Sequence, residues 1–189
     1  MRLLIVVLCV WSFSVSAQNR TDDSVVNESA NLAWSLNEWR QMAEEGQATA
    51  QYNLGLIHEY GRGVARNDVE AVDWYRKASV QGMSAAQYKL GVMYDNGWGV
   101  APSDVDAAKW YGDAAEQGHP FAQHDLAFMY AAGTGVLQDY VRAYMWLDIA
   151  VASGNSLMAK HLDSVSRELS VAQIKEAHRM AGEWMEKNR

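Results

Sequence analysis

The stretch at residues 86–118 reads AQYKLGVMYDNGWGVAPSDVDAAKWYGDAAEQG and decides the fold, because it recurs before and after itself at a spacing of 36 residues. Twelve of the 14 glycines occupy positions that repeat at this spacing, so they mark structural boundaries. Self-similarity at such a period is typical of a solenoid of stacked helix pairs. The residues that coincide include Leu54, Leu90 and Leu126; Trp74, Trp110 and Trp146; and Gly61, Gly97 and Gly133.

Each unit contains two predicted helices joined by a Gly-x-Gly-Val loop. In the first helix of the middle unit, Ala86, Leu90 and Met93 recur at three- and four-residue steps, which indicates one apolar face. Gly91 adjoins this face and has no side chain, so we expect a neighbouring helix to approach closely there. The loop at 97–100 reads GWGV, and its glycines permit positive backbone dihedrals where the chain reverses.

The second helix of each unit is predicted to begin just after a residue whose short side chain caps helix N-termini well. These residues are Asn67, Ser103 and Asp139. The recurring tryptophan lies on the apolar stripe of this helix in every unit. We therefore expect all three tryptophans in the core.

Incomplete units flank the three full ones. A leading helix is predicted over 31–45 and two closing helices over 156–187, the second of them capped by Ser170. Terminal units of a solenoid must cover the apolar edge of the neighbouring repeat. One leading helix, three pairs and two closing helices give an all-α fold of about nine helices in one domain over 30–189.

The motif A-x-x-x-L-G, the Gly-x-Gly-Val loop and the pattern A-x-x-W-Y/L-x-x-A-x-x-G together resemble the Sel1-like repeats, which are relatives of the tetratricopeptide repeat. The resemblance covers full repeats over about 47–82, 83–118 and 119–154. It implies a right-handed α-superhelix that acts as an adaptor in protein assembly and has no catalytic centre. Some cysteine-rich relatives carry a disulfide in every repeat, and penicillin binding has been associated with that branch. The repeats of this chain contain no cysteine.

The N-terminal residues differ in composition from the rest of the chain. An apolar run over 3–10 is followed by the small residues of a cleavage site, V-S-A, at 15–17. We therefore expect a secretory signal peptide at 1–17, a flexible polar leader at 18–29, and a periplasmic or secreted bacterial protein without a membrane span after cleavage. An uncleaved membrane anchor is the alternative, although the run is short for one. Cleavage would remove Cys9, the single cysteine.

Composition limits the classes of partner. The chain carries a net charge of −7, and hydrophobic residues make up 49% of the sequence. This apolar content favours a folded protein over a disordered one. Binding to phosphate groups needs a clustered basic face, which the sequence lacks, so no nucleic-acid partner is expected.

A search for catalytic and metal-binding patterns gives no candidate. The five histidines include no His-Glu-x-x-His pair, and no serine lies in a Gly-x-Ser-x-Gly turn. We therefore predict no catalytic residue, no cofactor and no metal ligand, and expect the protein not to be an enzyme. A zinc site built by histidines from separate helices is an alternative that the spacing leaves open.

Two features predict a surface for a protein partner. Trp98 fills a loop position that Arg62 and Thr134 hold in the other units, so the fold does not require its aromatic ring. The second feature is a stripe of the first helices whose chemistry varies between units, and which forms a groove for a peptide or helix if these helices line the concave side. An inter-helix surface without a ligand is the alternative. The predicted binding residues are Trp98, Tyr60, Lys89, Val92, Asn96, Phe121, Asp125 and Phe128.

Together these features predict a non-catalytic, secreted or periplasmic scaffold that binds another protein and assembles or regulates an envelope process. Two other functions stay open. A cell-wall-directed hydrolase or β-lactam-binding protein is suggested by the cysteine-rich relatives alone. A secreted effector that binds host proteins would share the binding surface but act at a different location.

Overall fold

The computed structural model describes residues 36–154 and 158–188. Residues 36–44 are helical, and eight further helices follow, so the described ranges contain nine helices and no strand. The predicted signal peptide and leader lie outside the described residues. The helices are α2 (Ala48–Tyr60), α3 (Asp68–Ser79), α4 (Ser84–Asn96), α5 (Asp104–Glu116), α6 (Pro120–Ala132), α7 (Tyr140–Ala152), α8 (Ala159–Ser166) and α9 (Val171–Lys187).

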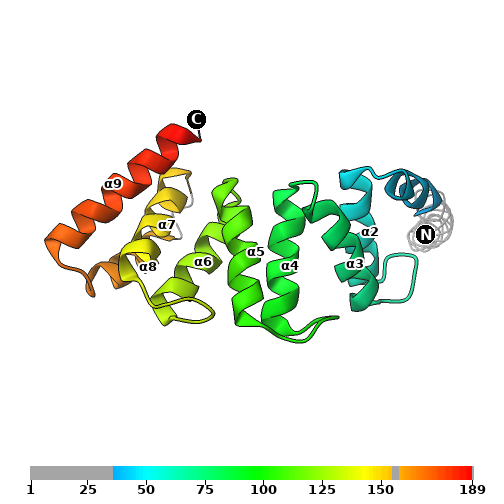
Figure 1. Ribbon diagram of the computed structural model, residues 1–189, viewed down its shortest axis with the longest axis horizontal. Coiled ribbons are helices and arrows are strands. Elements are labelled where there is room, and N and C mark those ends of the chain that lie inside the picture. The colour runs from blue at the N-terminus through cyan, green and yellow to red at the C-terminus, as the bar shows by residue number, and fades with distance from the viewer. Residues whose placement is uncertain (1–35, 155–157, 189) are drawn as a thin grey trace, which may run out of the picture.

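The helices follow one another along the long axis of the molecule in the order of the sequence (Figure 1). Within each full unit the first helix packs on the second, as α2 on α3, α4 on α5 and α6 on α7. Successive units also pack together, because α3 contacts α4 and α5 contacts α6. The predicted all-α solenoid of helix pairs is therefore confirmed.

Small residues of the first helix admit a large side chain from the second helix of the same unit. A Cβ atom added at Gly91 would overlap the ring of Tyr111, and one added at Gly55 would overlap the ring of Tyr75. Both rings are almost fully buried. The prediction that the glycine allows a close helix approach is confirmed, and the element that approaches is the tyrosine of the paired helix.

Caps and loops have the predicted geometry. The side chains of Asn67, Ser103 and Asp139 each accept a hydrogen bond from the backbone N–H three residues further on. A side chain at Gly99 would overlap the backbone carbonyl of Asp68 in the preceding unit, and the equivalent loop glycine of the next unit lies equally close to Asp104. The second loop glycine therefore allows neighbouring units to stack.

The expectation that all three recurring tryptophans are core residues is wrong for two of them. Trp146 is 4% exposed, whereas Trp74 and Trp110 are half-buried at the edge of their clusters. Neighbouring residues of a helix point about 100° apart, so the tyrosine that follows each of these tryptophans reaches the paired helix and the tryptophan faces outward. Trp146 is covered because Trp184 of α9 packs against it, with ring centroids 5.8 Å apart.

The C-terminal helix closes the solenoid. Ser170 and Gln173 form a capping box at the start of α9, which confirms the predicted cap. α9 packs on α7, so it covers the last full unit as a terminal repeat must. Within the described ranges, none of the helices combines the length and apolar character needed to cross a membrane.

Candidate partner-binding face

The predicted partner residues of α2, α4 and α6 are here called the first-helix face, and five of these seven residues lie where the first helices of successive units meet. We call these meeting places the first boundary (α2 with α4), the second boundary (α4 with α6) and the third boundary (α6 with α8). Equivalent sequence positions, 36 residues apart, supply the side chains at the first two boundaries. The chemistry that they present nevertheless differs from one boundary to the next.

The first boundary holds an ion pair. The ammonium of Lys89 lies 2.8 Å from the carboxylate of Glu59 and donates to the hydroxyl of Tyr60 at 3.1 Å. Glu59 is 7% exposed and also accepts a hydrogen bond from the hydroxyl of Tyr75. Burial alone would lower the pKa of Lys89, but its hydrogen bonds to Glu59 and Tyr60 outweigh burial and raise it. This boundary therefore carries a charged group that is already neutralised.

The second boundary holds two carboxylates instead. Asp95 and Asp125 occupy the positions equivalent to Glu59 and Lys89. The hydroxyl of Tyr111 lies 3.5 Å from the Asp95 carboxylate. Burial is the main factor that raises the pKa of Asp95, and the nearby carboxylates of Asp104 and Asp125 raise it further.

Aromatic rings surround the Asp125 side of this second boundary. Tyr88 stacks on His119 with ring centroids 4.5 Å apart, and its ring lies 6.0 Å from that of Phe121. Burial, together with the Asp125 carboxylate, raises the pKa of Tyr88 to about 12. Asp125 also lies 2.7 Å from the ring nitrogen of His124. The second boundary thus combines negative charge with exposed and half-buried rings.

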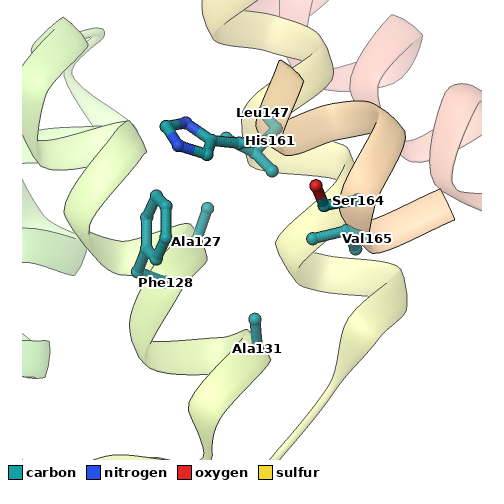
Figure 2. A pocket seen from close by; sticks show the side chains of 7 residues that line it. All are labelled: Ala127, Phe128, Ala131, Leu147, His161, Ser164 and Val165. Carbon is teal, nitrogen blue, oxygen red and sulfur yellow. The ribbon is translucent and has the colours of Figure 1, made fainter. Parts of the chain in front are cut away.

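The third boundary forms a small apolar pocket of about 60 Å³ (Figure 2). Figure 2 shows the rings of Phe128 and His161 at one end of the pocket and Ala131 at the other. The two rings meet edge to face, with centroids 4.9 Å apart. The remaining lining residues are Ala127, Leu147, Ser164 and Val165.

The predicted binding residues therefore fall into three groups. Tyr60 and Lys89 meet at the first boundary, Phe121 and Asp125 at the second, and Phe128 at the third. The other predicted residues have different surroundings. Val92 is half-buried against the core, the Asn96 amide donates to the Val92 carbonyl at 2.9 Å, and Trp98 is 41% exposed in its loop. Their role in binding stays a prediction.

Sequence reasoning missed the acidic partners of this face. Glu59 and Asp95 precede Tyr60 and Asn96 in the chain and do not lie on the same helical stripe, so the search along one stripe passed over them. A signal was present, because superposing the repeats shows that this position changes from Glu to Asp to Ala131. His161 was also missed, since it belongs to the irregular last unit.

A wider groove lies on the opposite helices, between α5, α7 and α9. Its two parts have volumes of about 420 and 450 Å³ and share Glu116, Tyr130 and Trp146 as lining residues. Gly112 lies in one of these parts, at the position where the first unit has Arg76. The Arg76 guanidinium donates to the Tyr94 hydroxyl, so the missing side chain at Gly112 leaves room that the first unit fills.

Within 36–154 and 158–188, no group of three or more His, Cys, Asp or Glu side chains is placed to hold a metal ion. The arrangement of the first-helix face is suited to holding side chains of another molecule through charge, hydrogen bonds and ring contacts.

Comparisons with known proteins agree with this geometry. The family model described as "Sel1 repeat" matches residues 48–83, 84–119 and 120–155. No curated protein matches the chain at a significant level. Among solved structures, c5321, a protective antigen present in uropathogenic Escherichia coli strains and displaying an SLR fold, is 36% identical with a TM-score of 0.74. That match covers 81% of this chain and 33% of the antigen.

Two further solved structures are similar. A Sel1 repeat protein from Oxalobacter formigenes is 29% identical with a TM-score of 0.63, and the match covers 71% of this chain and 58% of that protein. This chain thus spans a third of the first structure and somewhat more than half of the second. Cysteine rich protein B of Helicobacter pylori is 19% identical with a TM-score of 0.56, covering 71% of this chain and 96% of that one, and shows likeness of fold alone.

The family match extends over three consecutive repeats, and these coincide with the three helix pairs of the structure. Sel1 repeats generally mediate binding between proteins. The resemblance predicted from the glycine, leucine and tryptophan positions is confirmed. The chain belongs to the Sel1 repeat family.

Proposed function

We propose that this protein is a non-catalytic, secreted or periplasmic scaffold that binds a segment of another protein along its first-helix face and so assembles or regulates an envelope process. The observation that carries the proposal is the contrast between interior and face. Interior positions such as Leu54, Leu90 and Leu126 repeat in the three units, whereas the face changes from an ion pair to two carboxylates to an apolar pocket. A surface whose chemistry changes from one boundary to the next is suited to selecting one partner sequence.

Exposed aromatic side chains on the same face support the proposal. Tyr60, Phe121 and Phe128 are 54%, 60% and 43% exposed. Aromatic residues are enriched among the side chains that contribute most to protein binding, because they bury a large area with few rotatable bonds. Three of them on one face, each at a different boundary, provide anchoring points along the solenoid.

Affinity capture with variants tests the proposal. The full coding sequence, with a C-terminal tag, is expressed in a bacterial host, and retained proteins are identified by mass spectrometry. We expect a retained partner that is lost in the double variant Trp98→Ala and Phe128→Ala. The matched control is Val80→Ala with Leu137→Ala, because these side chains are 80% and 91% exposed and lie outside the first-helix face.

Two results would contradict the proposal. One is a partner retained equally by both double variants, which would place binding elsewhere. The other is hydrolysis by the purified protein, or its labelling by a fluorescent penicillin, abolished by a single change in a pocket residue, which would make it an enzyme or a β-lactam-binding protein. In both double variants, an unchanged helical circular dichroism spectrum shows that the fold is retained.

Fractionation tests the location. We expect the protein in the periplasm or the culture medium, with an N-terminus that begins at Gln18 after removal of residues 1–17. Recovery in the membrane fraction with an intact N-terminus would favour the uncleaved anchor instead. Recovery from the medium alone would favour an effector that binds host proteins over an envelope scaffold.

A further inference from the structure

The first two boundaries share three groups but differ in the charge at a fourth position, and Tyr60 of the first boundary is replaced by Asn96 at the second. Each has a carboxylate from the last turn of the first helix, a buried tyrosine from the second helix that reaches it, and a half-buried tyrosine beside it. The first boundary adds the ammonium of Lys89, and the second adds the carboxylate of Asp125 at the equivalent position. The equivalent groups are Glu59 and Asp95, Tyr75 and Tyr111, and Tyr52 and Tyr88.

At the first boundary, a cationic group of the protein itself, the Lys89 ammonium, is bound by these groups. The Lys89 ammonium contacts the Glu59 carboxylate at 2.8 Å and lies 5.1 Å from the centre of the Tyr60 ring. A carboxylate with adjacent tyrosine rings is a favourable environment for an ammonium or guanidinium group, through charge and through the ring quadrupole. Lys89 thus serves as an internal example of the bound group.

At the second boundary no such cation is supplied from within. Among the described residues, no lysine or arginine forms an ion pair with Asp95 or Asp125; Asp125 lies beside the Tyr88 hydroxyl and 2.7 Å from the ring nitrogen of His124. Two carboxylates that face one boundary repel each other, and an added cation relieves that repulsion. Where the first boundary has an ammonium, the second therefore has a second carboxylate.

We infer that the second boundary binds a lysine or arginine side chain of the partner protein, in the place that Lys89 holds at the first boundary. The inference rests on the proposed function, because it names the chemistry of the partner on the same face. The cationic group contacts Asp95 and Asp125, and its aliphatic stem packs beside Tyr88 and Phe121. The neutralised first boundary does not compete for this side chain.

Selection from a library of random twelve-residue peptides tests the inference on the full-length protein. We expect the selected peptides to contain lysine or arginine and to bind at least tenfold more weakly to Asp125→Lys. This change places an ammonium at the second boundary, as Lys89 does at the first. The matched control is Asp113→Lys, which makes the same change of charge at an exposed position of α5.

A second variant removes the charge without filling the site. Asp95→Asn combined with Asp125→Asn keeps the side-chain shapes, and we expect at least tenfold weaker binding of the same peptides. Thermal unfolding monitored by circular dichroism checks that both variants and the control are folded.

Free spermidine at equal ionic strength is a competitor whose effect separates a site for any polyamine from a site for a peptide side chain. Peptide displacement by spermidine at concentrations below those of the peptide would overturn the assignment to a protein partner.

The remaining outcomes separate the inference from the proposed function. Peptides that lack basic residues, or that bind equally to Asp125→Lys, but lose binding in Phe128→Ala, would overturn the inference and leave the proposed function standing. If Asp113→Lys and Asp125→Lys weaken the binding of basic peptides equally, the peptides are attracted by the net negative charge alone, and this result also overturns the inference. Failure to select any peptide would count against both.

Discussion

The second and third repeats have the same architecture, yet they differ at positions that decide their properties. Their four helices, α4, α5, α6 and α7, are each 13 residues long. Among the equivalent positions that differ are Gly91 and Ala127, Lys89 and Asp125, Met83 and His119, and Gly112 and Asp148. The comparison teaches which features of a repeat are needed for its helices to pack and which are free to vary.

The contact between paired helices shows how the framework tolerates change. In the second repeat Gly91 lies against the ring of Tyr111, and in the third repeat Ala127 and Leu147 occupy the equivalent positions. All of the packed side chains are 2% exposed or less. The second repeat pairs a very small residue with a large one, and the third repeat pairs two residues of intermediate size. The total volume of the pair is therefore kept, although both residues differ.

The largest expected effect comes from breaking this match at Gly91. Gly91→Leu places a side chain where the Tyr111 ring lies, and we expect the free energy of unfolding to fall by about 3 kcal/mol or more, since an overfilled core must shift its helices. Gly91→Ala should lower it by about 1 to 2 kcal/mol for the same reason. Urea unfolding measured by circular dichroism gives both values.

The third repeat indicates a second substitution that should restore the packing lost in Gly91→Ala. Adding Tyr111→Leu to Gly91→Ala recreates the Ala127 and Leu147 pair in the second repeat, and we expect the double variant to be more stable than Gly91→Ala alone. A double-mutant cycle isolates the coupling between the two positions. Strictly additive effects would show that the two residues do not constrain each other, against the packing described above.

The second prediction concerns the charged position at the boundaries. Lys89→Met leaves the Glu59 carboxylate, 7% exposed, without its cation, and we expect unfolding free energy to fall by about 2 to 3 kcal/mol because an unpaired buried charge is costly. Asp125→Asn should change it by less than about 0.5 kcal/mol, because it removes a repulsion with Asp95 along with a contact to His124. Equal losses in the two variants would contradict the difference between the boundaries.

These contrasts also explain how far the sequence predicts the structure. The helix pairs and caps were predictable because each pattern occurs three times at the same spacing, and a chance similarity rarely recurs in this way. The orientation of Trp74 and Trp110 was not, because a tryptophan followed by a tyrosine leaves open which ring faces the paired helix. The acidic pair at the second boundary combines Asp95 and Asp125, which come from different helices, and only the packing of successive units brings them together.

The third prediction uses the caps of the first helices. Met83 makes no side-chain cap to α4, whereas a ring nitrogen of His119 accepts the Ala122 N–H at the start of α6. Burial lowers the pKa of His119 below its ordinary value of 6.5. A lowered folded-state pKa means that the unfolded chain binds the proton more readily, so this stability is present above about pH 6.5 and is lost as pH falls below it.

His119→Asn tests that pH dependence. Asparagine caps helices without titrating, so we expect the variant to lose less stability than the wild type between pH 7.5 and pH 5, by up to about 1 kcal/mol, the usual contribution of one cap. Unfolding in urea at both pH values supplies the difference, in which the contributions of other groups cancel. Identical pH profiles would mean that protonation of His119 does not disturb the cap.

The smallest expected effect separates two glycines that look alike in the sequence. Gly91 and Gly112 both lie within helices, where glycine costs about 1 kcal/mol relative to alanine. A Cβ at Gly112 would meet no atom within 4 Å, in contrast to Gly91. We therefore expect Gly112→Ala to stabilise the protein by about 0.5 kcal/mol, measured by urea unfolding. Destabilisation by Gly112→Ala as large as that by Gly91→Ala would contradict this explanation. At Gly112 the added methyl group displaces no side chain, so helix packing could not then be the reason why Gly91 is needed.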